Sequence, residues 1–150
     1  MLRIGIKMSF EIKVCKDKAK ILEFLYAIDE TLPVPLSVRV DMDKFAEECA
    51  SNITYAIEDG GKLVSCCMFY YNFENKPYAY FDLLATVAGY GGRGYAGALM
   101  TAAENAAREA GMVEFHLHTN KENERAVSIY KSRGYVIIAT EPKLHMAKKL

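Results

Sequence analysis

The chain has 150 residues, of which 51% are hydrophobic and 25% are charged. A chain of this length builds one core more readily than two, so we expect a single domain over residues 1–150, with its core at about 10–150. The apolar content excludes a disordered chain, and ten Gly with four Pro exclude a collagen-like or low-complexity chain. Nineteen basic residues balance nineteen acidic ones, so no charge excess favours nucleic acid or an anionic membrane as a partner.

Spacing of apolar residues predicts the elements of the first half. Residues 10–14 alternate as a strand, and a helix follows from residue 18 to about 31, before two prolines. A second helix is expected with its apolar face over residues 42–49. Residues 53–58 and 63–73 are then predicted as strands joined by an Asp-Gly-Gly hairpin turn.

The second half is predicted to alternate strands with helices. Its elements are a strand at 78–87, a helix after the loop 89–94 that ends at Gly111, a strand at 113–119, a helix at 123–133, and strands at 135–139 and 143–147. The whole order is β-α-α-β-β-β-α-β-α-β-β. This order predicts the α/β (α+β) class, with a mixed sheet and helices on both of its faces.

The chain has four cysteines: Cys15, Cys49, Cys66 and Cys67. They form no C-x-x-C pair, and the two adjacent ones lie in a predicted strand, where they point to opposite faces. We expect buried free thiols in a reducing compartment rather than disulfides or a zinc site. With no apolar run of about eighteen residues, a cytoplasmic protein is expected. Whether Met1 or Met8 is the start stays open.

A glycine-rich stretch, residues 89–97, joins a buried strand to a helix and has five glycines in nine positions. Small residues there leave backbone N–H groups free at the helix N-terminus, where the helix dipole attracts negative charge. We expect this turn to hold a phosphate or pyrophosphate, with Arg93 adding a charged contact. A plain tight turn is one alternative. A Rossmann loop, Gly92-x-Gly94-x-x-Gly97, is another, but it needs more βαβ units than the remaining chain provides.

The same stretch resembles the R/Q-x-x-G-x-G/A motif of the Gcn5-related N-acetyltransferase (GNAT) superfamily. Gly94 and Ala96 fill the two small positions, and Gly91 stands where the family has Gln or Arg. Asn123 to Tyr135 is similar to the family's N-x-x-A-x-x-x-Y-x-x-x-G-F/Y segment. The resemblance covers the whole chain and implies a GNAT-like, mostly antiparallel central sheet.

The resemblance implies acetyl transfer from acetyl-CoA to a primary amine, by direct attack in a ternary complex. Tyr130 would protonate the departing thiolate, although an aromatic that only packs the helix onto the sheet is the alternative. The residues expected to bind the coenzyme are Leu84, Ala85, Thr86, Gly91, Gly92, Arg93, Gly94, Tyr95, Ala96, Asn123 and Tyr130. The acceptor, whether a small metabolite, an amino sugar or a protein, is unidentified.

The general base has several candidates. Asp82 precedes Leu84 by two residues, so strand alternation is expected to place both on one face. His116, His118 and Glu114 share a face of the next strand, and water is a further candidate. The two histidines lack an evident third ligand, so no metal is expected.

The acceptor site is expected between the first two helices, their connecting turn and the final hairpin. Its candidates are Pro33 to Arg39, Tyr70, Tyr71 and His145. Arg39 would meet an acidic acceptor or pair with a neighbouring aspartate. A non-catalytic acyl-CoA sensor or interaction module is the alternative function, because Gly91 departs from the motif and the base is open. A homodimer is possible.

Overall fold

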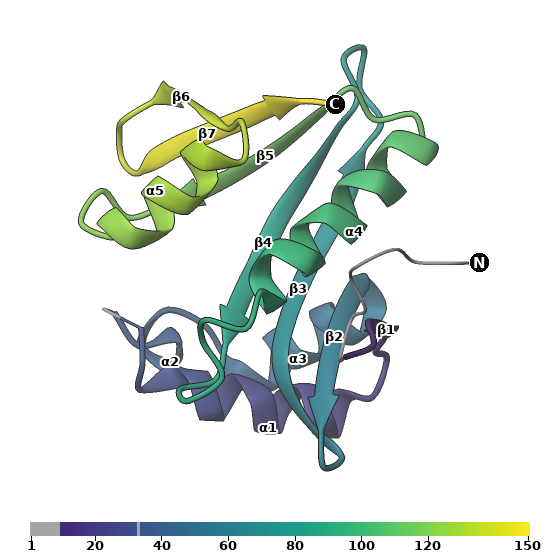
Figure 1. The fold of residues 1–150 in the computed structure, drawn as a ribbon, viewed down its shortest axis with the longest axis vertical. Coiled ribbons are helices and arrows are strands. Elements are labelled where there is room, and N and C mark those ends of the chain that lie inside the picture. The colour runs from purple at the N-terminus through teal and green to yellow at the C-terminus, as the bar shows by residue number, and fades with distance from the viewer. Residues whose placement is uncertain (1–9, 33) are drawn as a thin grey trace.

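The computed structural model describes residues 10–32 and 34–150; Met1, Met8 and Pro33 lie outside the described residues. Within the described ranges the strands form a seven-stranded sheet of order β1-β2-β3-β4-β5-β7-β6 (Figure 1). The β4–β5 pair is parallel and the other neighbouring pairs are antiparallel. The predicted mixed, mostly antiparallel sheet is therefore confirmed.

The elements follow the predicted order closely. They are β1 (Lys13–Val14), α1 (Lys18–Asp29), α2 (Leu36–Arg39), α3 (Met42–Ser51), β2 (Ile53–Asp59), β3 (Lys62–Asn72), β4 (Tyr78–Thr86), α4 (Tyr95–Glu109), β5 (Glu114–Thr119), α5 (Glu124–Ser132), β6 (Val136–Ala139) and β7 (Leu144–Lys149). One element, α2, was not predicted: it is a single helical turn within the segment expected as a loop. The carboxylate of Asp29 holds this turn by accepting hydrogen bonds from the N–H and hydroxyl of Ser37, at 2.8 and 2.7 Å.

Local capping explains where the first helices begin. Asp17 accepts a hydrogen bond from the N–H of Lys20 at 3.2 Å, and Asp41 accepts one from the N–H of Lys44 at 3.1 Å. Each aspartate thereby satisfies a backbone donor that the first helical turn leaves unpaired. No helix among residues 10–32 and 34–150 is long and apolar enough to cross a membrane.

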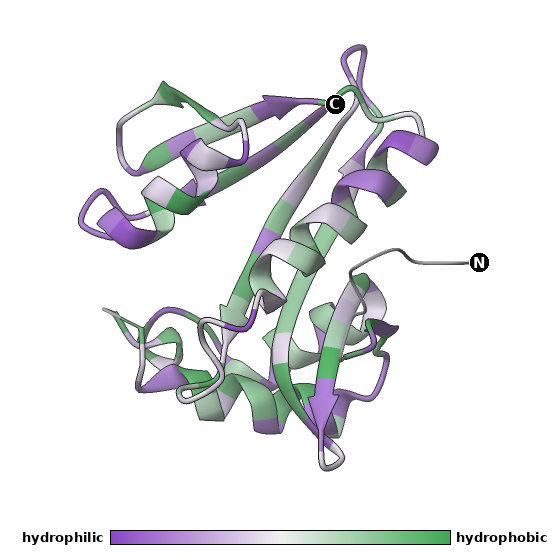
Figure 2. Cartoon of the chain, in the orientation of Figure 1, coloured by the Kyte–Doolittle hydropathy of each residue, from purple (hydrophilic) through white to green (hydrophobic). Residues whose placement is uncertain are grey.

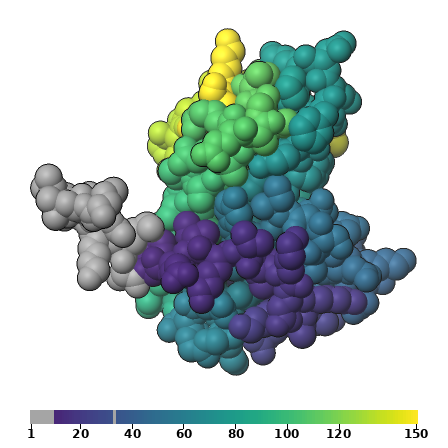
Figure 3. Space-filling view, turned by 90° about the vertical axis from the view of Figure 1, so that its right-hand side faces the viewer, coloured from purple at the N-terminus to yellow at the C-terminus, as the bar shows by residue number. Residues whose placement is uncertain are grey.

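The sheet separates two hydrophobic cores. One packs under α1 and α3 and the other under α4, and Figure 2 shows hydrophobic residues in green along these helices and along β3. Cys66 belongs to the first core and Cys67 to the second, so the predicted opposite orientation is confirmed. All four cysteines are buried free thiols, and burial raises the pKa of Cys67 to about 12. Figure 3 shows the N-terminal helical part, purple to blue, gathered below the green surface of α4.

A β-bulge in β4 changes which side chains face which core. Met68 of β3 lies opposite Leu83 and Phe69 lies opposite Phe81, so Asp82 is the extra residue. Phe81 consequently packs in the α4 core, whereas Leu83 packs under α1 and α3. The expectation that Asp82 and Leu84 share a face is wrong, because alternation does not continue through a bulge.

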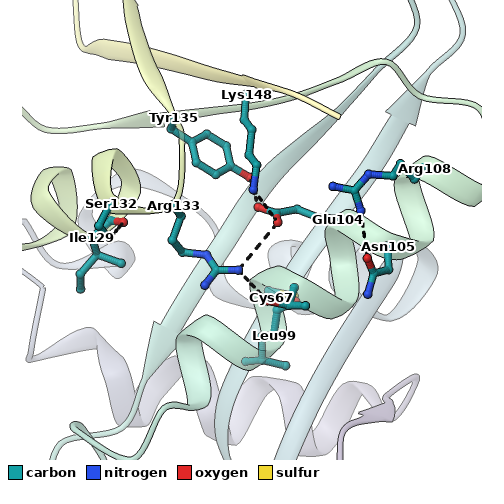
Figure 4. Close-up of polar contacts among 11 residues, drawn as sticks. Cys67, Leu99, Glu104, Asn105, Arg108, Ile129, Ser132, Arg133, Tyr135 and Lys148 are labelled. Atoms are coloured by element: carbon teal, nitrogen blue, oxygen red, sulfur yellow. Dashed lines mark hydrogen bonds and ion pairs between the residues drawn. The ribbon is translucent and has the colours of Figure 1, made fainter.

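A buried carboxylate joins α4 to the C-terminal strands (Figure 4). Glu104 is 4% exposed and accepts hydrogen bonds from the Tyr135 hydroxyl at 2.8 Å and from Lys148 Nζ at 3.0 Å. Arg133 lies 3.7 Å from the same carboxylate and donates to the Thr101 hydroxyl at 2.6 Å. This Glu104 cluster (Glu104, Tyr135, Lys148 and Arg133) fixes the segment after α5 against α4.

Strands β4 and β5 pair over only part of their length. Pairing runs from Tyr78 opposite Glu114 to Phe81 opposite Leu117. Beyond this point the two strands diverge, as Figure 1 shows. From residue 82 to 86, this edge of β4 therefore has no strand partner in the described part of the chain.

Candidate functional site

A cavity of about 560 Å³ lies at the end of β4, and we call it the loop cavity. The loop after β4 and the first turn of α4 form one wall, and α5 forms another. The predicted coenzyme residues that line it are Leu84, Ala85, Thr86, Gly91, Gly92, Gly94, Tyr95, Ala96 and Tyr130. The structure therefore brings together most of the set proposed from the motif.

The backbone of the loop at residues 89–94 leaves the N-terminus of α4 open to an anion. Gly89, Gly92 and Gly94 have φ of 91°, 76° and 80°, a left-handed conformation that other residues rarely adopt. The first helical hydrogen bond runs from the N–H of Ala98 to the C=O of Gly94. No side chain among the described residues caps this helix. The first N–H groups of α4 are available to a phosphate, and the helix dipole attracts the negative charge of such a group.

Two predicted coenzyme residues lie elsewhere. The guanidinium of Arg93 lies 4.7 Å from the ring centroid of Tyr90 and donates to the C=O of Gly89 at 3.4 Å, outside the lining of the loop cavity. The side chain of Asn123 caps α5 by accepting from the N–H of Ala126 at 3.2 Å. Asn123 lines the neighbouring cavity instead. Both side chains already make local contacts that sequence spacing does not reveal.

A second cavity, of about 330 Å³, opens where β4 and β5 diverge, and we call it the strand cavity. It shares Leu84, Ala85 and Tyr130 with the loop cavity, so these residues lie where the two meet.

Burial raises the pKa of Tyr130 above its ordinary value of 10.0. The phenol therefore keeps its proton at neutral pH, and it lies where the two cavities meet.

Two of the base candidates line the strand cavity. Asp82 and His118 both do so, together with Glu48 from α3. Partial burial raises the pKa of the Asp82 carboxyl, and the nearby Glu48 adds to the effect. Burial and the neighbouring Lys143 lower the pKa of His118, whose Nδ1 shares a 2.7 Å hydrogen bond with the Tyr80 hydroxyl.

The other two base candidates, His116 and Glu114, contact each other and do not line the strand cavity. His116 Nε2 lies 2.9 Å from Glu114, and His116 Nδ1 lies 2.8 Å from His145 Nε2. Glu114 also pairs with Lys76 at 2.9 Å, and these contacts lower the pKa of its carboxyl. In the described ranges, no three His, Cys, Asp or Glu side chains gather as ligands for a metal ion.

Comparison with known proteins assigns the family. The sequence profile of the acetyltransferase (GNAT) family matches residues 22–135. The chain belongs to this family. No curated protein gives a significant sequence match.

Solved structures share the GNAT fold over nearly the whole chain. Arabidopsis thaliana Naa50 in complex with the bisubstrate analogue CoA-Ac-MVNAL is 20% identical with a TM-score of 0.77, over 95% of this chain and 100% of that one. A GNAT acetyltransferase from Streptococcus pneumoniae is 18% identical with a TM-score of 0.75, over the same shares. The PaiA N-acetyltransferase from Thermoplasma acidophilum, in complex with coenzyme A, is 16% identical with a TM-score of 0.73, again over 95% and 100%.

The acceptor candidates of this GNAT domain divide into three groups. Leu36 and Arg39 line the strand cavity, as expected for the segment after α1. Tyr70 and His145 line a third cavity. Tyr71 packs against the α4 core and lines none of these three cavities.

Sequence reasoning missed one charged residue of the loop cavity. Arg125, in the first turn of α5, lines this cavity with Ala126, Ile129 and Tyr130. These positions are spaced as one face of a helix, which is a signal that the sequence does contain. The structure thus places the cationic side chain of Arg125 in the lining of the loop cavity, where the sequence led us to expect Arg93.

Proposed function

We propose that this GNAT domain transfers an acetyl group from acetyl-CoA to a primary amine by direct attack in a ternary complex. The observation that carries the proposal is the junction of two cavities at Leu84, Ala85 and Tyr130. A thioester approaching from the loop cavity and an amine approaching from the strand cavity reach the same point. Holding both reactants in this geometry removes much of the entropic cost of a bimolecular reaction.

The loop cavity fits coenzyme A in shape and chemistry. The N–H groups at the start of α4 and the guanidinium of Arg125 suit a pyrophosphate. Residues 82 to 86 of β4 have no partner on the β5 side in the described ranges, so their backbone groups can bond to the amides of a pantetheine arm. Coenzyme A in the Thermoplasma PaiA complex and the CoA conjugate in the Arabidopsis Naa50 complex support this choice.

The residues at the junction supply the proton transfers. Asp82 accepts a proton from the acceptor ammonium and passes it to solvent, which leaves a neutral amine. Backbone N–H groups of β4 polarise the thioester carbonyl while the C–N bond forms and the C–S bond breaks. Tyr130 donates its proton to the departing sulfur. The proton lost by the attacking nitrogen replaces the one that Tyr130 gives up, so the charges balance.

Ligand-induced stabilisation tests coenzyme binding, with two glycine variants as a matched pair. We expect acetyl-CoA to raise the melting temperature of the wild type and of Gly91→Ala, since a Cβ at Gly91 meets nothing within 4 Å. Gly94→Ala is expected to bind about ten-fold more weakly, because its φ of 80° costs a residue with a Cβ about 1–2 kcal/mol. Titration calorimetry gives both affinities.

The outcomes separate the candidate functions. Absence of stabilisation by acetyl-CoA or coenzyme A would reject coenzyme use altogether. Binding without thiol release across a panel of primary amines would favour the alternative, a non-catalytic acyl-CoA sensor or interaction module. Equal affinities in Gly91→Ala and Gly94→Ala would show that the loop does not hold the pyrophosphate.

The pH dependence of kcat/KM tests Asp82 as the base. A base works when ionised, so the rate is expected to rise with pH through the raised pKa of Asp82 and then level off. Asp82→Asn should remove this acid limb and lower kcat/KM about 100-fold. Glu48→Gln is the matched control: it removes a neighbouring negative charge, so the limb should move to lower pH with the plateau retained.

His118 is the other candidate for the general base, and the pH profile of kcat/KM tests it as well. An acid limb that survives in Asp82→Asn but disappears in His118→Asn would transfer the role of base to His118. A limb that survives in both variants would leave water as the proton acceptor.

A further inference from the structure

A third cavity, of about 550 Å³, adjoins the strand cavity on the sheet face opposite α4, and we call it the Tyr–His cavity. Its lining residues are Tyr70, Tyr78, Tyr80, Asp82, His116, His118 and His145. They come from β3, β4, β5 and β7, and they include every histidine of the chain. Asp82 and His118 line the strand cavity as well, so one ligand can extend from one space into the other.

The aromatic rings of the Tyr–His cavity form a continuous row. Neighbouring ring centroids are 5.4 Å apart for Tyr70–Tyr80, 5.6 Å for Tyr80–His118, 4.3 Å for His118–His145, 4.9 Å for His145–His116 and 4.7 Å for His116–Tyr78. Six rings therefore present π-electron density around one open space. Such surfaces attract organic cations, because the face of an aromatic ring carries partial negative charge.

The charges around this row also favour a cation. Burial lowers the pKa of His118 and of His145, so the neutral form of each imidazole predominates at pH 7. Glu114 is already paired with Lys76 and His116. Among the ion pairs of the described residues, none includes Asp82. The carboxylate at the boundary of the two cavities is thus available to a positively charged ligand.

The lining of the Tyr–His cavity contains no Lys or Arg side chain of the described residues. Arg39 and Lys143 line the strand cavity but do not line the Tyr–His cavity. Lys76 is paired with Glu114 at 2.9 Å. Ring faces and Asp82 therefore line the Tyr–His cavity, and the charge of Lys143 reaches its edge at His118.

We propose that the Tyr–His cavity is an acceptor subsite for a second cationic group, so that the preferred substrates are diamines or polyamines. The inference rests on the proposed acetyl transfer. The reacting amine occupies the strand cavity beside Asp82, an alkyl chain passes Asp82 and His118, and the distal ammonium lies over the tyrosine rings. A substrate with one amine fills only the first of these positions.

Matched acceptors test the subsite. Thiol release is measured with 1,5-diaminopentane and with 5-amino-1-pentanol, which has the same chain length and a neutral hydroxyl at its end. We expect kcat/KM to be about ten-fold higher for the diamine, mainly through a lower KM. Phenethylamine as a third acceptor probes the alternative, an aromatic group stacked on the rings.

Tyrosine variants link the preference to the row. Tyr70→Leu removes one ring face and should reduce the ratio between diamine and amino alcohol at least three-fold, whereas Tyr70→Phe should retain it. Tyr26→Leu is the control, since this tyrosine is 57% exposed on α1, far from the row in sequence and outside the cavity lining. The ratio of kcat/KM between diamine and amino alcohol in Tyr26→Leu should equal that of the wild type.

Direct binding separates this inference from the proposed reaction. Calorimetry with 1,5-diaminopentane and 5-amino-1-pentanol should show the same preference whether or not turnover occurs. Diamine binding without thiol release from any amine would support the subsite and refute the proposed activity. Equal kcat/KM and equal binding for the two ligands, a preference for phenethylamine, or an unchanged ratio in Tyr70→Leu would each overturn the subsite.

Discussion

Replacing Tyr130 by Phe is expected to lower kcat about 100-fold while changing coenzyme A affinity less than two-fold. The hydroxyl is the group proposed to protonate the departing thiolate, and Phe removes only that group. The ring stays in place, because it packs edge-on against Tyr135 with centroids 6.2 Å apart. Stopped-flow thiol detection gives kcat, and calorimetry gives the affinity for coenzyme A.

The pH profile distinguishes an acid from a packing residue. Burial raises the pKa of Tyr130, so the phenol is protonated over the physiological range and loses its proton only above pH 10. A general acid acts in its protonated form, and kcat of the wild type should therefore fall at this basic limb. Tyr130→Phe should show no such limb. An unchanged kcat in the variant would leave Tyr130 with the packing role that the sequence also allowed.

The secondary structure of this chain is predictable because local signals agree with tertiary packing. Asp17 and Asp41 cap the helices that they precede, and the apolar periods of α1 and α3 match the buried side chains of the first core. The glycine loop was predictable for the same reason. The left-handed φ values at positions 92 and 94 favour glycine, so the glycines in the sequence indicate this backbone conformation.

The arrangement of the acceptor side was not predictable, since it depends on pairing between distant strands. The bulge at Asp82 arises from the register of β4 against β3, and no residue type near Asp82 signals it. The row of rings joins side chains from Tyr70 to His145 across four strands. The local contact of Arg93 was not predictable for a related reason: its contact with Tyr90 competes with a phosphate, and residue type alone does not rank the two.

Replacing Glu104 by Ala is expected to lower the free energy of unfolding by about 3 kcal/mol, which a urea titration measures. The carboxylate accepts from Tyr135 and Lys148 and faces Arg133, as Figure 4 shows. Its removal leaves two neighbouring positive charges and a buried hydroxyl without their acceptor. Desolvated groups that lose a partner cost more than the intact pair contributes.

Variants that remove one feature at a time test this explanation. Glu104→Gln keeps an acceptor for the Tyr135 hydroxyl but loses the charge, so its loss of stability should be smaller than that of Glu104→Ala. Glu109→Ala, at the exposed end of the same helix, should change stability by less than about 0.5 kcal/mol. Equal stability of Glu104→Ala and Glu109→Ala would show that the cluster contributes nothing.

The Glu104 cluster also bears on catalysis through Tyr130. The C=O of Tyr130 accepts from the N–H of Tyr135 at 3.0 Å, and the two rings are in contact, so the anchor of Tyr135 on Glu104 holds Tyr130 at the junction of the cavities. Glu104→Ala at a temperature where it remains folded should therefore lower kcat. In the Tyr130→Phe background the same change should have little further effect on kcat, because the proposed proton donor is already absent.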